Sequence, residues 1–159
     1  MRRAGLRASF MIVVLAGVAA CAASPASPPT APQPTAKAWK DMTRRERGQY
    51  MGEVVLPRMR TLFQSFDAQH FAVVNCAMCH GPGAEDRTFR MPNEALPRLP
   101  DNAAGFQALA RQKPEWMRFM AEQVRPQMAA LLGKEEIDMR NPKPDAFGCR
   151  NCHVLGGAP

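Results

Sequence analysis

Two five-residue stretches of the chain combine cysteine and histidine in the same order. Both have the pattern Cys-x-x-Cys-His, and they are Cys76–His80 and Cys149–His153. Two thiols at this spacing can each add across one vinyl group of a porphyrin, and the adjoining histidine can then meet the iron from the same side. The pattern therefore predicts two covalently attached c-type haems with their iron. The attachment residues would be Cys76, Cys79, Cys149 and Cys152, and the proximal iron ligands His80 and His153.

Two other kinds of chemistry use cysteines at this spacing. Four cysteines in two Cys-x-x-Cys pairs can form a closed tetrahedral zinc site. They can also form disulfides, or one pair can act as a redox dithiol. Neither alternative explains why a histidine follows the second cysteine in both motifs. Apart from Cys21, every cysteine lies in the two motifs, and so do two of the three histidines.

The amino terminus has the features of an export signal. A basic start with Arg2, Arg3 and Arg7 precedes an apolar run over residues 10–20, which is too short to span a bilayer. The run ends in Val-Ala-Ala-Cys, which resembles the lipobox of bacterial lipoproteins. This resemblance implies a signal peptide over residues 1–20 and lipidation of Cys21, which would become the first residue of the mature protein. Ordinary cleavage without lipidation is the alternative.

Composition divides the rest of the chain into a linker and one domain. Residues 21–37 are rich in proline and alanine, and such a segment stays extended, so we expect a spacer between the lipid anchor and the domain. Residues 38–159 suffice for a single domain, which we expect to be a dihaem cytochrome c domain.

The formal net charge of +7 overstates how basic the mature protein is. Removal of the leader's three arginines leaves 18 basic against 14 acidic side chains, a net charge of +4. The four propionates of two haems would nearly cancel this excess, so we expect no binding to nucleic acid. A basic cluster, which could face lipid headgroups or an acidic partner or simply solvent, contains Lys37, Lys40, Arg44, Arg45 and Arg47.

Helix signals run through the domain. Thr43 and Glu46 fit a capping box at the start of helical structure that should extend to Phe66, and Pro57 should make this either one bent helix or two helices in series. Asp67 is expected to cap a short helix that carries the first motif. Further helices are expected over residues 103–112 and from Pro114 to a glycine end at Gly133. No segment shows strand alternation, so the predicted fold class is all-α.

The chain also contains an internal repeat. Five residues of the first helix recur 69 positions later, and the haem motif recurs 73 positions later, so the second connection is four residues longer. We therefore expect two pseudo-repeated units packed around two haems, each a kinked helix followed by a loop and the motif. The recurring pairs are Met51 with Met120, Val55 with Val124, Pro57 with Pro126, Met59 with Met128, and Leu62 with Leu131.

This unit resembles that of the multihaem cytochrome subunit of photosynthetic reaction centres, and it is similar to small dihaem lipoprotein cytochromes of bacteria. The resemblance covers residues 51–80 and 120–153. It implies that a methionine on the preceding helix ligates the iron attached through the following motif. Methionine is a soft ligand that favours ferrous iron.

The matched positions Met59 and Met128 are the favoured distal ligands. Met51 with Met120 is the second equivalent pair. The candidates without a counterpart in the other unit are His70, Met91 and Met139.

These features predict a membrane-tethered electron carrier. We expect a c-type cytochrome on the periplasmic side of a bacterial membrane, passing single electrons between a donor and an acceptor protein and catalysing no reaction of its own. The outer membrane is expected because Ala22 stands where an inner-membrane lipoprotein commonly has aspartate. The alternative is a haem-based gas or redox sensor, or a dihaem peroxidase-like enzyme, with one open coordination position.

Overall fold

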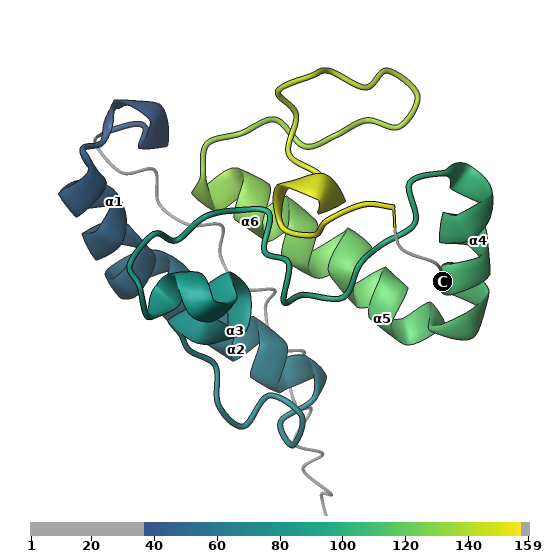
Figure 1. The fold of residues 1–159 in the computed structure, drawn as a ribbon, viewed down its shortest axis with the longest axis horizontal. Coiled ribbons are helices and arrows are strands. Elements are labelled where there is room, and N and C mark those ends of the chain that lie inside the picture. The colour runs from purple at the N-terminus through teal and green to yellow at the C-terminus, as the bar shows by residue number, and fades with distance from the viewer. Residues whose placement is uncertain (1–36, 157–159) are drawn as a thin grey trace, which may run out of the picture. The chain divides into compact units, whose positions relative to one another are not determined.

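The computed structural model of the protein describes residues 37–156 (Figure 1). The predicted signal peptide, most of the predicted linker and the predicted lipidation site Cys21 lie outside the described residues. Within residues 37–156 the chain forms helices and no strands, apart from isolated bridges, so the all-α prediction is confirmed for this part. None of the helices in this part is both long and apolar enough to cross a bilayer.

The first long helix is continuous through its proline. It comprises α1 (Arg44–Tyr50), a π-helical turn η2 (Met51–Val55) and α2 (Leu56–Phe66). Pro57 has no N–H, so the helix cannot keep its ordinary ladder there. The π turn immediately before it takes up one extra residue, and the Leu56 N–H donates to the carbonyl of Met51, five residues earlier. Where the sequence predicted a kink, the helix therefore contains a π turn, which is wider than an ordinary α-helical turn.

The second long helix has the same construction. It comprises α5 (Pro114–Phe119), the π turn η4 (Met120–Val124) and α6 (Arg125–Leu131). The Arg125 N–H donates to the carbonyl of Met120, again five residues back and again just before a proline. The two π turns are 69 residues apart, the same offset as the sequence repeat.

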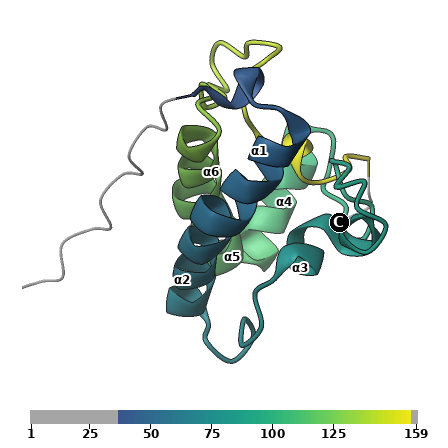
Figure 2. The ribbon, with the colours of Figure 1, turned by 90° about the vertical axis from the view of Figure 1, so that its left-hand side faces the viewer.

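The two long helices pack against each other in antiparallel directions (Figure 2). The Tyr50 hydroxyl donates to the Leu131 carbonyl at 2.8 Å, and near the opposite end Phe66 stacks on Phe119 with ring centroids 4.1 Å apart. Between them, Arg58 Nε donates to Gln127 Oε1 at 3.0 Å. Arg58 and Gln127 are equivalent positions of the repeat, so the two long helices contact each other at the same position in each repeat unit.

Apolar side chains at this contact form the core. Its buried members are Met42, Tyr50, Val55, Met59, Phe63, Phe71, Val74, Phe119 and Leu131. Burial of this apolar surface is the main stabilising term for such a helix pair.

The remaining elements confirm several helix-end predictions. Helix α4 (Ala103–Gln112) is capped by the Asn102 side chain, and Pro114 begins α5. Gly133 follows α6 with a φ of +59°, the left-handed conformation expected of a glycine after a helix end. The short 3-10 helices are η1 (Trp39–Asp41), η3 (Gly81–Ala84) and η5 (Cys149–Asn151).

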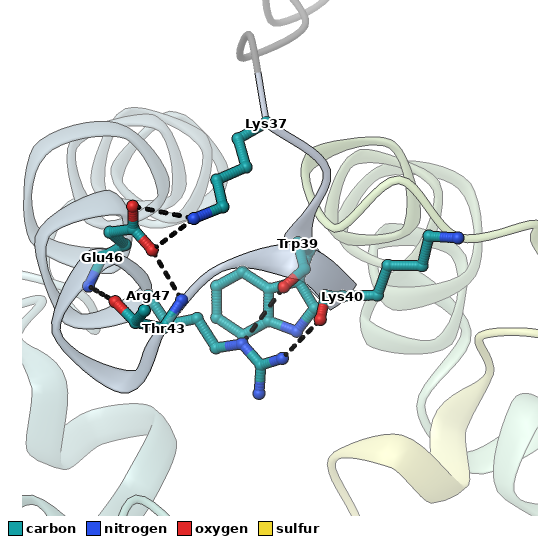
Figure 3. Close-up of polar contacts among 6 residues, drawn as sticks. All are labelled: Lys37, Trp39, Lys40, Thr43, Glu46 and Arg47. Carbon is teal, nitrogen blue, oxygen red and sulfur yellow. Dashed lines mark hydrogen bonds and ion pairs between the residues drawn. The ribbon is translucent and has the colours of Figure 1, made fainter.

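Residues 37–42, which lead into α1 and are called the entry segment below, are joined to α1 by several hydrogen bonds (Figure 3). The predicted capping box is present, since Thr43 and Glu46 bond each other's backbone N–H. Lys37 pairs with the Glu46 carboxylate at 2.9 Å, and the Arg47 guanidinium donates to the Trp39 and Lys40 carbonyls at 3.1 Å. Two of the five side chains of the basic cluster, Lys37 and Arg47, therefore hold the entry segment in place.

Candidate haem-attachment site

The first motif forms a short helix, α3 (Cys76–His80), supported by neighbours close in sequence. The Asn75 side chain caps it by accepting the Met78 N–H at 3.1 Å. Arg60 of α2 donates from Nε and Nη2 to the carbonyl of buried Val74, at 3.3 and 3.2 Å. The first motif is therefore attached to the helix that precedes it.

The prediction that Asp67 caps this helix is wrong. Asp67 Oδ1 accepts the N–H groups of Gln69 and His70 and closes a separate turn. The next residues then leave helical structure until Asn75. Aspartate and asparagine are equally good caps, and the one adjacent to the motif takes that role.

The second motif is a 3-10 turn supported in a different way. Asn151, inside the motif, accepts the Gly148 N–H at 2.7 Å, and the His153 N–H donates to the Cys149 carbonyl at 2.9 Å. The buried residues Ala146, Phe147 and Gly148 precede it, and the Phe147 N–H donates to the Glu135 carbonyl at 2.7 Å. The connection between α6 and the second motif thus folds back on itself, so that Phe147 near its end bonds Glu135 near its start.

The segment between α3 and α4 brings the two motifs together (Figure 1). Asn93 donates from its side-chain Nδ2 to the Cys79 carbonyl and from its backbone N–H to the Cys152 carbonyl, both at 2.9 Å. Further along, the Leu99 N–H donates to the Val154 carbonyl at 3.0 Å. Residues 93–99 therefore run beside residues 152–156, and the two motifs become neighbours.

The thiols of the two motifs influence one another. Burial raises the pKa of Cys152 to about 11, with smaller contributions from the neighbouring Cys79 and Cys149. Burial, followed by the proximity of Cys76, also raises the pKa of Cys79. The second cysteine of each motif is therefore a neutral thiol at neutral pH.

The two histidines have different surroundings. His153 Nδ1 lies 2.9 Å from the Pro97 carbonyl oxygen, and because a carbonyl only accepts, the proton must be on Nδ1. Its Nε2 is then the nitrogen free to bind a metal, with the tautomer and ring orientation fixed by the other nitrogen. His80 Nδ1 is buried without a hydrogen-bond partner, and burial lowers the pKa of this imidazole. The exposed Phe89 ring lies edge-on to His80 at 5.3 Å between centroids.

These surroundings fit haem as the expected group. All four motif cysteines are free thiols, as thioether formation requires. The bond of His153 Nδ1 to the Pro97 carbonyl leaves Nε2 as the nitrogen that could bind a metal, whereas the His80 nitrogen without a hydrogen-bond partner is Nδ1. Among residues 37–156, no three side chains of the histidine, cysteine, aspartate and glutamate types are grouped as metal ligands, so the thiols are not arranged as a tetrahedral zinc set.

The repeated methionines of both helices contact one core. Met59 is buried, with 3% of its surface exposed, whereas Met128, Met51 and Met120 are partly buried and pack against the same cluster. In a regular α-helix, residues eight apart point about 80° apart, but the extra residue of the π turn reduces this to about 20°. The π turns thus place both candidate methionines of each helix on nearly the same side.

The candidates outside the repeat are placed differently. Met139 is 76% exposed, on the loop before the second motif. His70 is exposed and lies against Trp116 of the other long helix, with ring centroids 5.0 Å apart. Met91 is partly buried and precedes a cis bond to Pro92.

Sequence reasoning missed Asn93, Arg60 and Pro97 as site residues. A local signal existed for Asn93, because asparagine after proline favours a turn in which its side chain accepts an N–H two residues on. That bond is present, from Ala95 to Asn93 Oδ1 at 2.9 Å. Its contact with Cys152, 59 residues away, had no sequence signal.

Comparison with family models, with curated proteins and with solved structures finds no match to this chain.

Proposed function

We propose that the protein is a dihaem c-type cytochrome that carries single electrons between two redox partners. The proposal rests on the proximity of two Cys-x-x-Cys-His motifs whose four thiols are free. Asn93 donates a hydrogen bond to the backbone carbonyl of the second cysteine of each motif. A bound haem supplies an iron that alternates between the ferrous and ferric states and so stores one electron.

The chain's own residues would perform three tasks in such a carrier. Cys76 and Cys79, and likewise Cys149 and Cys152, would hold one haem each. His80 and His153 would provide the proximal ligands, and the Pro97 carbonyl would keep the His153 ring oriented through Nδ1. Met59 and Met128 remain the proposed distal ligands, because they occupy equivalent positions of the sequence repeat and both contact the same core.

The finer fold proposal follows from this assignment. The two units, each a long helix with a π turn followed by a connection and a motif, would pack around two haems. Support comes from the matched π turns and from the contact between the equivalent residues Arg58 and Gln127. A unit of this size has little core of its own without its porphyrin.

Haem content tests the proposal directly. A pyridine haemochrome assay on protein produced with the c-type maturation machinery should give two haems per chain. The double variant Cys149→Ser with Cys152→Ser should retain one haem, and so should the variant with both first-motif cysteines replaced. A wild-type protein with fewer than two haems contradicts the proposal.

Carbon monoxide separates the electron carrier from a sensor or peroxidase-like enzyme. A carrier with two six-coordinate irons should not bind carbon monoxide rapidly after reduction. Rapid binding at one haem of the wild-type protein would favour the second class, because it requires an open position on the iron.

The membrane attachment is part of the proposal. A lipid on Cys21 would tether the domain to the periplasmic face of a membrane, the outer membrane being preferred, through the linker of residues 21–37. Mass spectrometry of the mature protein should find Cys21 as a lipidated first residue. Cys21→Ser should release the haem protein into the soluble periplasmic fraction, and a variant that stays membrane-bound contradicts the tether.

A further inference from the structure

Asn93 is a buried polar residue, and the hydrogen bonds that it makes go to the two motifs or to its own turn. Its exposed fraction is 6%, and no other polar or charged residue among residues 37–156 reaches the same degree of burial. Buried polar groups are costly unless they are hydrogen-bonded. Here Oδ1 accepts the Ala95 N–H, Nδ2 donates to Cys79, and the backbone N–H donates to Cys152.

The two acceptors are the same atom of the two motifs. Cys79 and Cys152 are both the second cysteine of their motif, and in both the acceptor is the backbone carbonyl oxygen, at 2.9 Å from the Asn93 nitrogen concerned. Each carbonyl belongs to a residue that would carry a thioether. The position of Asn93 therefore determines where two haem attachment points lie relative to each other.

The surrounding backbone leaves Asn93 little freedom. Gly81, directly after the first motif, has a φ of +54°, and a Cβ there would lie 2.8 Å from Asn93 Oδ1. On the other side the alignment continues, since Leu99 donates to Val154 and Gly156 donates back to Leu99, both at 3.0 Å. The bond from Asn93 to Cys152 is thus the first in a series of backbone hydrogen bonds that hold residues 93–99 against the second motif and the residues after it.

We propose that Asn93 is a positioning residue that fixes the two haem-attachment motifs relative to each other and so sets the mutual orientation and electronic coupling of the two haems. This inference rests on the proposed dihaem function. Electronic coupling falls steeply with the separation of two cofactors and depends on their orientation, so a small movement at this residue should be measurable.

The experiment compares two substitutions in the full-length, haem-loaded protein. Asn93→Ala removes both side-chain bonds. Asn93→Ser retains a hydroxyl that can accept the Ala95 N–H but is too short to reach the Cys79 carbonyl. The readouts are circular dichroism in the Soret region, where two coupled haems give a paired positive and negative signal, and the separation between the two midpoint potentials.

Both variants are expected to hold two haems, to lose the paired Soret signal of the wild type and to show a changed separation of potentials. Asn102→Ala is the matched control, because Asn102 also bonds a backbone N–H, that of Gly105, but does so at the start of α4. It should cost the stability of a helix cap and leave the Soret signal unchanged.

An Asn93→Ala protein with two haems, an unchanged paired signal and unchanged potentials overturns the inference. If that variant fails to acquire haem, Asn93→Ser, which keeps the local turn, decides by the same criteria. Fewer than two haems in the wild type would instead overturn the proposed function, and the pyridine haemochrome assay shows this before any variant is compared.

Discussion

The two motifs share one sequence pattern but differ in how far along the chain their supporting contacts lie. The first is bonded by Arg60, Asn75 and Asn93, each within 14 residues of the residue that it bonds. The second has local bonds of its own, such as that between Gly148 and Asn151, but it is also bonded by Asn93 and Pro97, which lie more than 50 residues before it. These contacts of the first motif therefore all lie within residues 60–93, whereas the second also needs contacts that are distant in sequence. Local contacts form faster than distant ones, so the first motif should become ordered earlier.

The largest difference between the halves should appear at the repeated methionines. Met59→Ala should lower the free energy of unfolding by about 2–5 kcal/mol, because the side chain is almost fully buried in the core. Met128→Ala should cost less, since Met128 is only partly buried. Urea denaturation of the haem-loaded proteins measures both values.

The same two variants test the distal ligands. Each should remove the methionine-to-iron absorption band of its own haem, lower that haem's potential and create one carbon monoxide site. Met51→Ala and Met120→Ala are the matched controls, expected to change packing only. If Met128→Ala keeps the band at full strength for both haems, the ligand of the second iron is Met120 or Met139.

The cap of the first motif should contribute less to the free energy of unfolding than Met59 does. Asn75→Ala removes the cap of α3 and should cost about 0.5–2 kcal/mol. The effect should be confined to the first half, so amide hydrogen exchange should accelerate at residues 76–80 and stay unchanged at residues 149–153. Equal acceleration at both motifs would contradict the division into local and distant support.

The contact between the long helices should contribute still less. Tyr50→Phe removes the hydroxyl that donates to the Leu131 carbonyl and should cost about 0.5–1.5 kcal/mol. The equivalent residue of the second half is Phe119, which has no hydroxyl. The haem spectra should not change. A loss well above this range in thermal or urea unfolding would mean that the bond does more than join the helices.

The smallest effect should be that of the entry segment. The hydrogen bond from Lys37, followed by those from Thr43, lowers the pKa of Glu46 to about 2. A lowered carboxyl pKa stabilises the fold above the ordinary value near 4.5, and this contribution disappears as the pH falls toward 2. Lys37→Ala should raise the Glu46 pKa in an NMR titration. An unchanged pKa would assign the shift to the capping box alone.

Local signals accounted for much of the fold. The capping box at Thr43, Pro114 at a helix start and Gly133 after a helix end each depend on a few adjacent residues, and each was predicted from the sequence. The π turns were missed because a proline shows that a helix must adapt but not how. Asn93 was missed because its partners are set by how the loop crosses the second motif, and no periodicity specifies that crossing.

The matched π turns also bear on how a repeated chain of this kind could arise. A π turn is an α-helix with one additional residue, and here it occurs at positions 69 apart, each directly before a Leu-Pro or Arg-Pro pair. One insertion followed by duplication of the whole unit accounts for both turns, whereas two separate insertions would have had to strike the same place twice. The insertion is then the older event. On the same account the four-residue difference between the connections is the later event, because it distinguishes the two copies.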